Sequence, residues 1–134
     1  MAIKNPELVP LFNQLKSILE PYAKHFDVLE SEGAYHLIYT GEVKFDKYVR
    51  DEVYFASLMI QKNFVGFYFM PQYTTQNGPE YFAGQNMLKL LKGKSCYNIT
   101  QKAYTENTNV LKEEIETMLK KGLESYKKLG WTKN

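Results

Sequence analysis

A helical pattern of apolar residues opens the chain. Leucine, isoleucine and phenylalanine recur at helical spacing between residues 8 and 19, and this spacing makes one apolar stripe along a helix. Asn5 stands where an N-cap is expected, and Pro6 suits the first helical position. Pro21 disfavours helical geometry in the residue before it. The pattern therefore predicts a helix over residues 6–19.

After His25 the hydrophobic period changes from the helical value to two, the period of a strand. Apolar and polar residues alternate over 34–40 and 42–49, and strand-forming residues continue over 53–61 and 64–70. The run over 42–49 is rich in charge, which is typical of an edge strand. Only Lys-Asn separates the last two runs, so we predict a hairpin there, with the asparagine at a positive φ.

The predicted hairpin has two different faces, because side chains of a strand point alternately to opposite sides. One face is wholly apolar and should pack under helices; it carries Ala56, Leu58, Ile60, Val65, Phe67 and Phe69. The other face is mixed; it carries Phe55, Ser57, Met59, Gln61, Phe64, Gly66, Tyr68 and Met70. Gly66 leaves a bare spot on the mixed face, where another group can approach the backbone closely.

The second half of the chain adds helices and one strand. Turn residues surround Gly78. A helix is expected over 79–92, either continuous or broken near Gly84 and ended by Gly93, and a short strand over 94–100. A long amphipathic helix over 109–129 follows, and Gly130 fits a left-handed Schellman ending. We expect one α+β domain over residues 1–134, in which an antiparallel β-sheet is packed by the N-terminal and C-terminal helices as a two-layer sandwich.

Composition and charge restrict the function classes. The net charge is only +2 and no basic run occurs, so we expect no nucleic-acid partner. Neither a signal peptide nor a membrane-spanning run is recognisable, so we expect no membrane association and a cytoplasmic location. The single cysteine, Cys96, has no partner for an internal disulfide, which fits a reducing compartment.

Three sequence features are candidates for a chemical function. The "GKS" at 93–95 lacks the earlier glycine of a phosphate loop and has the wrong element order, so a helix end with solvated lysines is favoured. His25 and His36 do not form a spaced metal-ligand pair. A nucleophilic Cys96 needs a base nearby in space, and no helix N-terminus precedes it to lower its pKa; an inert, buried cysteine is the commoner case.

Several segments resemble the YdhG-like family, small bacterial domains of largely unknown function. The resemblance covers nearly the whole chain and is most specific at "FVGFYFMP" (64–71) and "LLKGKSC" (90–96). It implies an α+β fold with a helix-packed antiparallel sheet. It also implies a relationship to a frataxin-like iron chaperone, and iron is the only cofactor that it brings in. An iron site needs several carboxylate ligands, and the closing helix carries Glu113, Glu114, Glu116 and Glu124. Lysines interleave with these glutamates, which favours solvated, ion-paired helix faces over a metal site.

The mixed hairpin face is the best candidate for a site. Aromatic rings with a few hydroxyl groups are typical of small-ligand pockets, although such tyrosines more often pack with only their hydroxyl groups at the surface. The predicted pocket consists of Ser57, Met59, Gly66, Tyr68, Tyr73, Lys94 and Tyr97. We therefore expect a binding module for an unknown small molecule or protein partner that catalyses no reaction. The alternatives are an iron-binding chaperone and, more remotely, an enzyme that uses Cys96.

Overall fold

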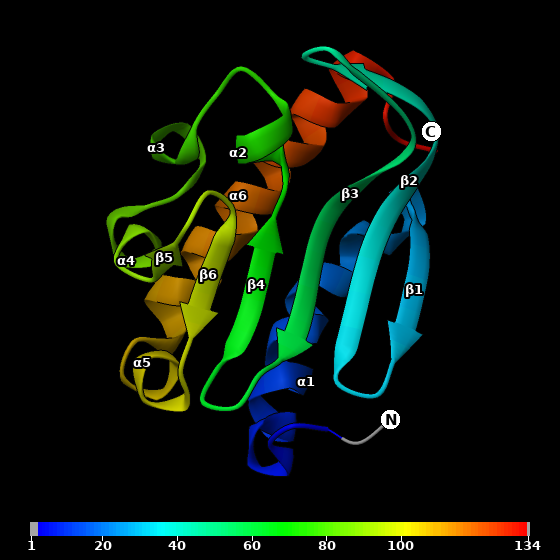
Figure 1. Ribbon diagram of the computed structural model, residues 1–134. Helices are drawn as coiled ribbons and strands as arrows, with labels where there is room; N and C mark the ends of the chain where they lie inside the picture. The colour runs from blue at the N-terminus through cyan, green and yellow to red at the C-terminus, as the bar shows by residue number, and fades with distance from the viewer. Residues whose placement is uncertain (1–2, 134) are drawn as a thin grey trace.

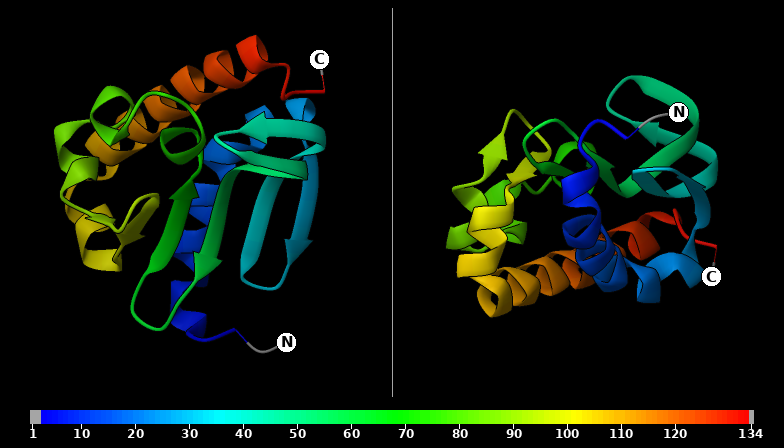
Figure 2. Two further views of the ribbon diagram at one scale, coloured as in Figure 1. Left: turned by 45° about the horizontal axis from the view of Figure 1, so that its top comes forward. Right: turned by 90° about the horizontal axis from the view of Figure 1, so that it is seen from below.

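The computed structural model describes residues 3–133, which form a sheet layer and a helix layer (Figure 1). The sheet is antiparallel, with strand order β1-β2-β3-β4-β6-β5. Its strands are β1 (Asp27–Ser31), β2 (Ala34–Phe45), β3 (Tyr48–Ile60), β4 (Val65–Phe69), β5 (Leu91–Lys92) and β6 (Cys96–Ile99). The two long helices, α1 (Val9–Leu19) and α6 (Thr108–Leu129), lie on the same face of the sheet (Figure 2). This arrangement confirms the predicted α+β fold.

Shorter helices connect these elements. They are η1 (Pro6–Leu8), η2 (Glu20–His25), α2 (Pro71–Thr74), α3 (Pro79–Phe82), α4 (Gln85–Leu88) and α5 (Gln101–Glu106). Asn5 caps the first of them as predicted, because its side chain accepts a hydrogen bond from the Glu7 amide. A continuous helix over 79–92 is wrong, whereas the break near Gly84 is confirmed, since α3 and α4 lie on either side of it; the end of the range forms the short strand β5. Gly93 has a φ of 74° and turns the chain between β5 and β6, so it does not end a helix.

The β3–β4 hairpin has the predicted register. Ser57 pairs with Tyr68 and Met59 with Gly66, and the loop closes with a 2.8 Å hydrogen bond from the Gln61 amide to the Phe64 carbonyl. The predicted positive φ of the loop asparagine is wrong, since Asp46 is the only non-glycine residue with a positive φ in the part of the chain that the structure describes. The apolar face packs under the helices, and its six residues are all buried.

Phe55 does not lie on the mixed face, where the alternation placed it. Leu37 pairs with Ala56 but the next residue, Ile38, pairs with Tyr54, so Phe55 is an extra residue in a β-bulge. Its ring is fully buried and stacks on Phe26, with ring centroids 4.5 Å apart. The bulge therefore turns two consecutive residues of β3 toward the helices.

The predicted continuous strand over 42–49 is also wrong. It contains a tight turn at Asp46–Lys47, where Asp46 has a φ of 56°, and this turn joins β2 to β3. We call residues 40–53, the distal half of the β2–β3 hairpin, the outer arm. A second register shift between Thr40 and Val43 bends the arm away from the rest of the sheet (Figure 2).

Candidate functional site

Four of the seven predicted pocket residues share the sheet face that α1 and α6 leave uncovered. They are Ser57, Met59, Gly66 and Tyr68. An ideal Cβ atom placed on Gly66 lies 2.9 Å from the Tyr68 ring, so that ring already covers the glycine. The bare spot that the sequence predicts beside Gly66 is thus filled by a side chain of the same strand. Burial raises the pKa of Tyr68, and nearby Cys96 adds to the effect.

Tyr97 lies on the opposite side of the sheet from Tyr68. In the β4–β6 ladder Tyr97 pairs with Phe67, and Cys96 pairs with Tyr68. The Tyr97 ring is fully buried, and its hydroxyl donates a 2.5 Å hydrogen bond to Oε1 of Gln72. The structure therefore separates Tyr97 from Ser57 and Tyr68. The sequence contains no signal for the register between β4 and β6, because a long connection joins these strands.

The uncovered face holds a serine–histidine pair that the sequence analysis missed. Nδ1 of His36 lies 2.7 Å from Oγ of Ser57, because β2 and β3 place the two residues opposite each other. Ser57 is 4% exposed and burial lowers the pKa of His36. A nucleophile needs access to its substrate and a base that a third group orients. The pair satisfies the buried Ser57 hydroxyl and the part-buried His36 ring, and no hydrogen bond within the described residues supplies a third group that orients the histidine.

Cys96 is not an activated thiol. Burial raises the pKa of Cys96, whereas a nucleophilic cysteine needs a lowered one. Its Sγ atom donates a hydrogen bond to Oδ1 of Asn98 at 3.3 Å, within the same strand. This environment is that of a structural cysteine.

A large cleft lies at the end of the sheet, between the outer arm, α2 and the end of α6. We call it the arm cleft; its volume is about 640 Å³. It is lined by Lys44, Phe45, Asp46, Tyr73, Thr74, Thr75, Gln76, Asn77, Tyr81, Glu124, Ser125, Lys128, Leu129 and Trp131. Of the predicted pocket residues, Tyr73 lines the arm cleft. Nζ of Lys94 lies 5.7 Å from the centre of the Tyr73 ring.

Helix α2 is held rigidly by its two buried polar side chains. Thr74 shares a 2.9 Å hydrogen bond with the Tyr126 hydroxyl, and Gln72 donates one of 2.7 Å to the Lys94 carbonyl. Both side chains are buried, and Tyr73 between them is 49% exposed. A helix of only four residues has little stability of its own. These buried bonds therefore keep the Tyr73 ring projecting at the cleft.

The end of α6 forms the opposite wall through the predicted Schellman ending. Gly130 has a φ of 78°, its amide bonds to the Lys127 carbonyl, and the Trp131 amide bonds to the Tyr126 carbonyl at 2.8 Å. The Trp131 ring then contacts the Tyr126 ring at 5.1 Å and the Phe45 ring of the outer arm at 6.4 Å. Trp131 thus joins the arm tip to the helix end, and this contact closes the cleft on one side.

Many polar groups in the arm cleft have no partner within residues 3–133. No hydrogen bond or ion pair involves the side chains of Lys44, Asp46, Gln76, Asn77, Glu124 and Lys128. Two of these side chains are cationic lysines, two are anionic carboxylates and two are neutral amides. The cleft thus combines aromatic walls with exposed donors and acceptors of both charges that make no bond to the described part of the protein.

A second cleft, the edge cleft, lies beside the arm cleft and has a volume of about 530 Å³. One wall is β3, through Arg50, Asp51, Glu52, Val53 and Tyr54. The other wall comes from Met70, Tyr73 and Thr74. Phe45, Tyr73 and Thr74 line both clefts, so these three residues stand between them.

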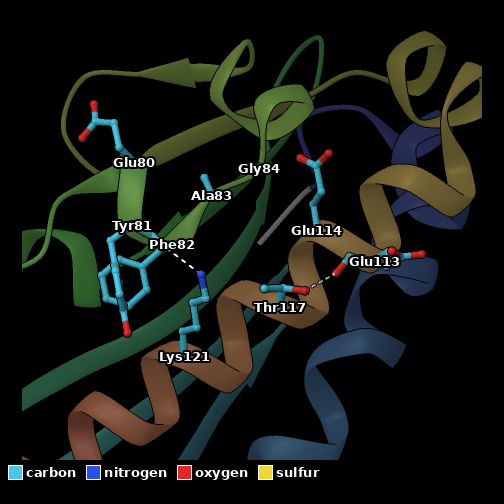
Figure 3. A pocket seen from close by; sticks show the side chains of 9 residues that line it. All are labelled: Glu80, Tyr81, Phe82, Ala83, Gly84, Glu113, Glu114, Thr117 and Lys121. Atoms are coloured by element: carbon cyan, nitrogen blue, oxygen red, sulfur yellow. Dashed lines mark hydrogen bonds between the residues drawn. The ribbon is translucent and has the colours of Figure 1, made fainter.

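A third cleft, of about 250 Å³, lies between α3 and α6 (Figure 3). Its main polar groups are already bonded to the protein. The Glu114 carboxylate accepts 2.8 Å hydrogen bonds from the Met87 amide and the Asn86 side chain, and Lys121 donates to the Tyr81 carbonyl. Gly84 makes room for Glu114, since a Cβ atom there would lie 2.5 Å from that carboxylate. This cleft therefore has fewer free polar groups to bind a ligand than the arm cleft has.

The described residues contain no cluster suited to a metal ion. Within 3–133 no group of three or more histidine, cysteine, aspartate or glutamate side chains is close enough to hold one. Nor does any helix in this range combine the length and the apolar character that crossing a bilayer requires.

No protein-family model, curated protein or solved structure matches the chain. The resemblance to the YdhG-like family therefore stays a prediction.

Proposed function

We propose that this protein is a non-catalytic binding module that holds a small molecule in the arm cleft. The observation that carries the proposal is the cleft itself, whose volume of about 640 Å³ falls within the roughly 300–1,000 Å³ typical of small-molecule sites. Phe45, Tyr73 and Trp131 bring aromatic surface to it from three different elements. Aromatic walls are usual in such sites, and the arm cleft differs from the usual composition in having nine polar or charged residues among its fourteen lining residues.

The unpartnered side chains suggest the chemistry of the ligand. A planar apolar group fits the aromatic walls, and the amides of Gln76 and Asn77 favour a ligand that hydrogen-bonds. Because the lining lysines and carboxylates are equal in number, a neutral or zwitterionic polar group suits the cleft better than a strongly anionic one. The ligand class that we propose is therefore a small aromatic molecule with amino and carboxyl groups.

The surroundings of Ser57 and Cys96 support a module without catalysis. The serine is buried against His36, and burial raises the pKa of the cysteine thiol. The iron-chaperone alternative rests on the YdhG-like resemblance alone, since Glu114 is bonded to α4 and Glu124 lies at a different cleft. A cytoplasmic location without a nucleic-acid partner remains part of the proposal.

Fragment binding followed by NMR tests the proposal. The probe is a library of aromatic fragments that carry amino and carboxyl groups, added to isotope-labelled protein. We expect shifts of the amides of Tyr73 and Gln76 and of the Trp131 indole. Tyr73→Ala should weaken the binding roughly fivefold, because an aromatic contact contributes about 1 kcal/mol. Leu29→Ala, an exposed residue of β1, is the matched control and should change nothing.

Two results would overturn the proposal. One is a fragment set whose shifts centre on Ser57 and Tyr68, which would return the site to the uncovered sheet face. The other is the absence of any fragment that shifts the residues of the arm cleft.

A further inference from the structure

One edge of β3 lacks a neighbouring strand over half of its length. The strand runs from Tyr48 to Ile60, but β4 pairs only with residues 56–60. The last backbone bond on this side joins the Met70 amide to the Phe55 carbonyl at 3.0 Å. On the other side β2 accompanies β3 to the turn. Residues 48–53 therefore have a strand partner on one side only (Figure 1).

The missing neighbour has a local cause. After β4 the chain reaches Pro71, which cannot donate a ladder hydrogen bond and suits the first position of a helix. The chain therefore enters α2 where a longer β4 would have continued. The space beside β3 that results is the edge cleft, with α2 as its far wall.

An extended peptide is the kind of ligand that suits this unpaired edge. Alternate residues of an edge strand point their N–H and C=O groups outward, and another extended chain satisfies them all at once. The Val49 carbonyl is one such outward group, because the guanidinium of Arg50 bonds to it at 3.1 Å. Charged side chains on an edge also prevent indiscriminate pairing, and Arg50, Asp51 and Glu52 supply them here.

The charges in the edge cleft favour a basic peptide. Arg50 is already engaged, since it bonds to Val49 and lies 4.7 Å from the centre of the Tyr48 ring. Asp51 and Glu52 have no hydrogen-bonding or ionic partner among residues 3–133. The contacts of Arg50 leave its charge in place, but the lining still carries one more negative than positive charge. Met70 and Tyr73 add an apolar wall.

We propose that residues 48–53 of β3 bind an extended peptide segment of a partner protein as an added strand. Asp51 and Glu52 recognise its lysine or arginine side chains, and Met70 and Tyr73 accept an apolar one. A second copy of this chain is a poorer occupant, because its own β3 edge is walled in by its own α2. This site shares Tyr73 with the arm cleft, but its acidic residues Asp51 and Glu52 do not line that cleft, and the proposal does not depend on a small-molecule ligand.

A synthetic peptide in which pairs of lysines alternate with pairs of valines is the probe, because Asp51 and Glu52 point to opposite faces of β3 and such a strand presents lysines on both faces. It is titrated into the isotope-labelled protein. We expect shifts of the amides of residues 48–53 and of Tyr73, together with slower hydrogen exchange at Val49. Replacing both Asp51→Asn and Glu52→Gln should weaken the binding roughly fivefold, the effect of a pair of partly exposed ion pairs. The matched control removes two acidic charges elsewhere, with Glu32→Gln and Glu106→Gln, and should leave the affinity unchanged.

A second probe tests strand addition without altering the protein. A peptide with the same side chains, N-methylated at every residue, cannot donate ladder hydrogen bonds from either of its edges and should not bind. Equal binding of the N-methylated peptide, or an equal loss of affinity in the control variant, would reduce the interaction to nonspecific charge and overturn the proposal. Protection of residues 48–53 without peptide, with a concentration-dependent rise in mass, would make a second copy the occupant and overturn it as well. No binding of the lysine–valine peptide would also overturn it.

Discussion

The inner half and the tip of the β2–β3 hairpin share an alternating pattern of strand-forming residues but lie in different environments. In the inner half, Leu37 and Leu58 lie under the helices and are fully buried. In the outer arm, Tyr48 and Val49 are 40% and 55% exposed. The difference shows that an alternating pattern specifies a strand, whereas the elements that pack on the strand determine whether its apolar residues become core.

Two β-bulges separate these environments. The first inserts Phe55 and turns it toward Phe26, and the second, between Thr40 and Val43, bends the arm. As a result the inner half carries the packing of the sheet, and the arm forms walls of the arm cleft and the edge cleft. Binding surfaces commonly lie on such parts, where a rigid scaffold supports a less packed segment.

The largest difference between the halves should come from truncating an apolar side chain in each. Phe55→Ala removes a fully buried ring that stacks on Phe26 and should lower the free energy of unfolding by about 3–5 kcal/mol. Val49→Ala in the arm should change it by less than about 0.5 kcal/mol. Urea unfolding measures both. Equal losses in the two variants would show that the arm is packed as tightly as the inner half.

An intermediate effect is expected where the two halves meet. The buried Tyr126 hydroxyl donates to the Tyr54 carbonyl at 2.8 Å and shares a hydrogen bond with Thr74. Tyr126→Phe removes this hydroxyl from the Tyr54 carbonyl and the Thr74 hydroxyl, and it should lower the free energy of unfolding by about 1 kcal/mol. Tyr48→Phe, which removes an exposed hydroxyl from the arm, is the matched control and should be neutral. A neutral Tyr126→Phe would mean that the Thr74 and Tyr54 contacts do not stabilise the junction.

The last effect is absent at neutral pH and develops only in alkali. Burial raises the pKa of Tyr97 to about 12, whereas an unperturbed tyrosine titrates near about 10. Between these pH values the unfolded chain loses the phenol proton and the folded chain keeps it. The stability that the raised pKa contributes is therefore present below about pH 10 and is lost as the pH rises toward about 12.

Chemical unfolding at several alkaline pH values measures this loss. Tyr97→Phe should show a shallower decline of the free energy of unfolding with pH than the unaltered protein. Tyr73→Phe, whose hydroxyl lies on a half-exposed ring, is the comparison and should keep the original slope. Identical slopes for the Tyr97→Phe variant and the unaltered protein would argue against a buried, protonated Tyr97.

The sequence by itself determined the elements whose signals are local. The Asn5 cap, the stripe of α1, the register of the β3–β4 hairpin and the Schellman ending at Gly130 each depend on residues close together in the chain, and each was predicted. The antiparallel sheet under two long helices followed from the same signals. Local hydrogen bonding and alternation are sufficient to specify such features.

Only the tertiary structure decided where the clefts lie. The bulge at Phe55 and the β4–β6 register that buries Tyr97 depend on pairing between strands that no short turn connects. The predicted pocket therefore divided among two sheet faces and α2, with Tyr73 alone of its residues lining the arm cleft and the edge cleft. A shift of a single residue in strand pairing exchanges the two faces of a strand. The register of distant strands is set by how the whole core packs, and the sequence pattern within one strand does not encode it.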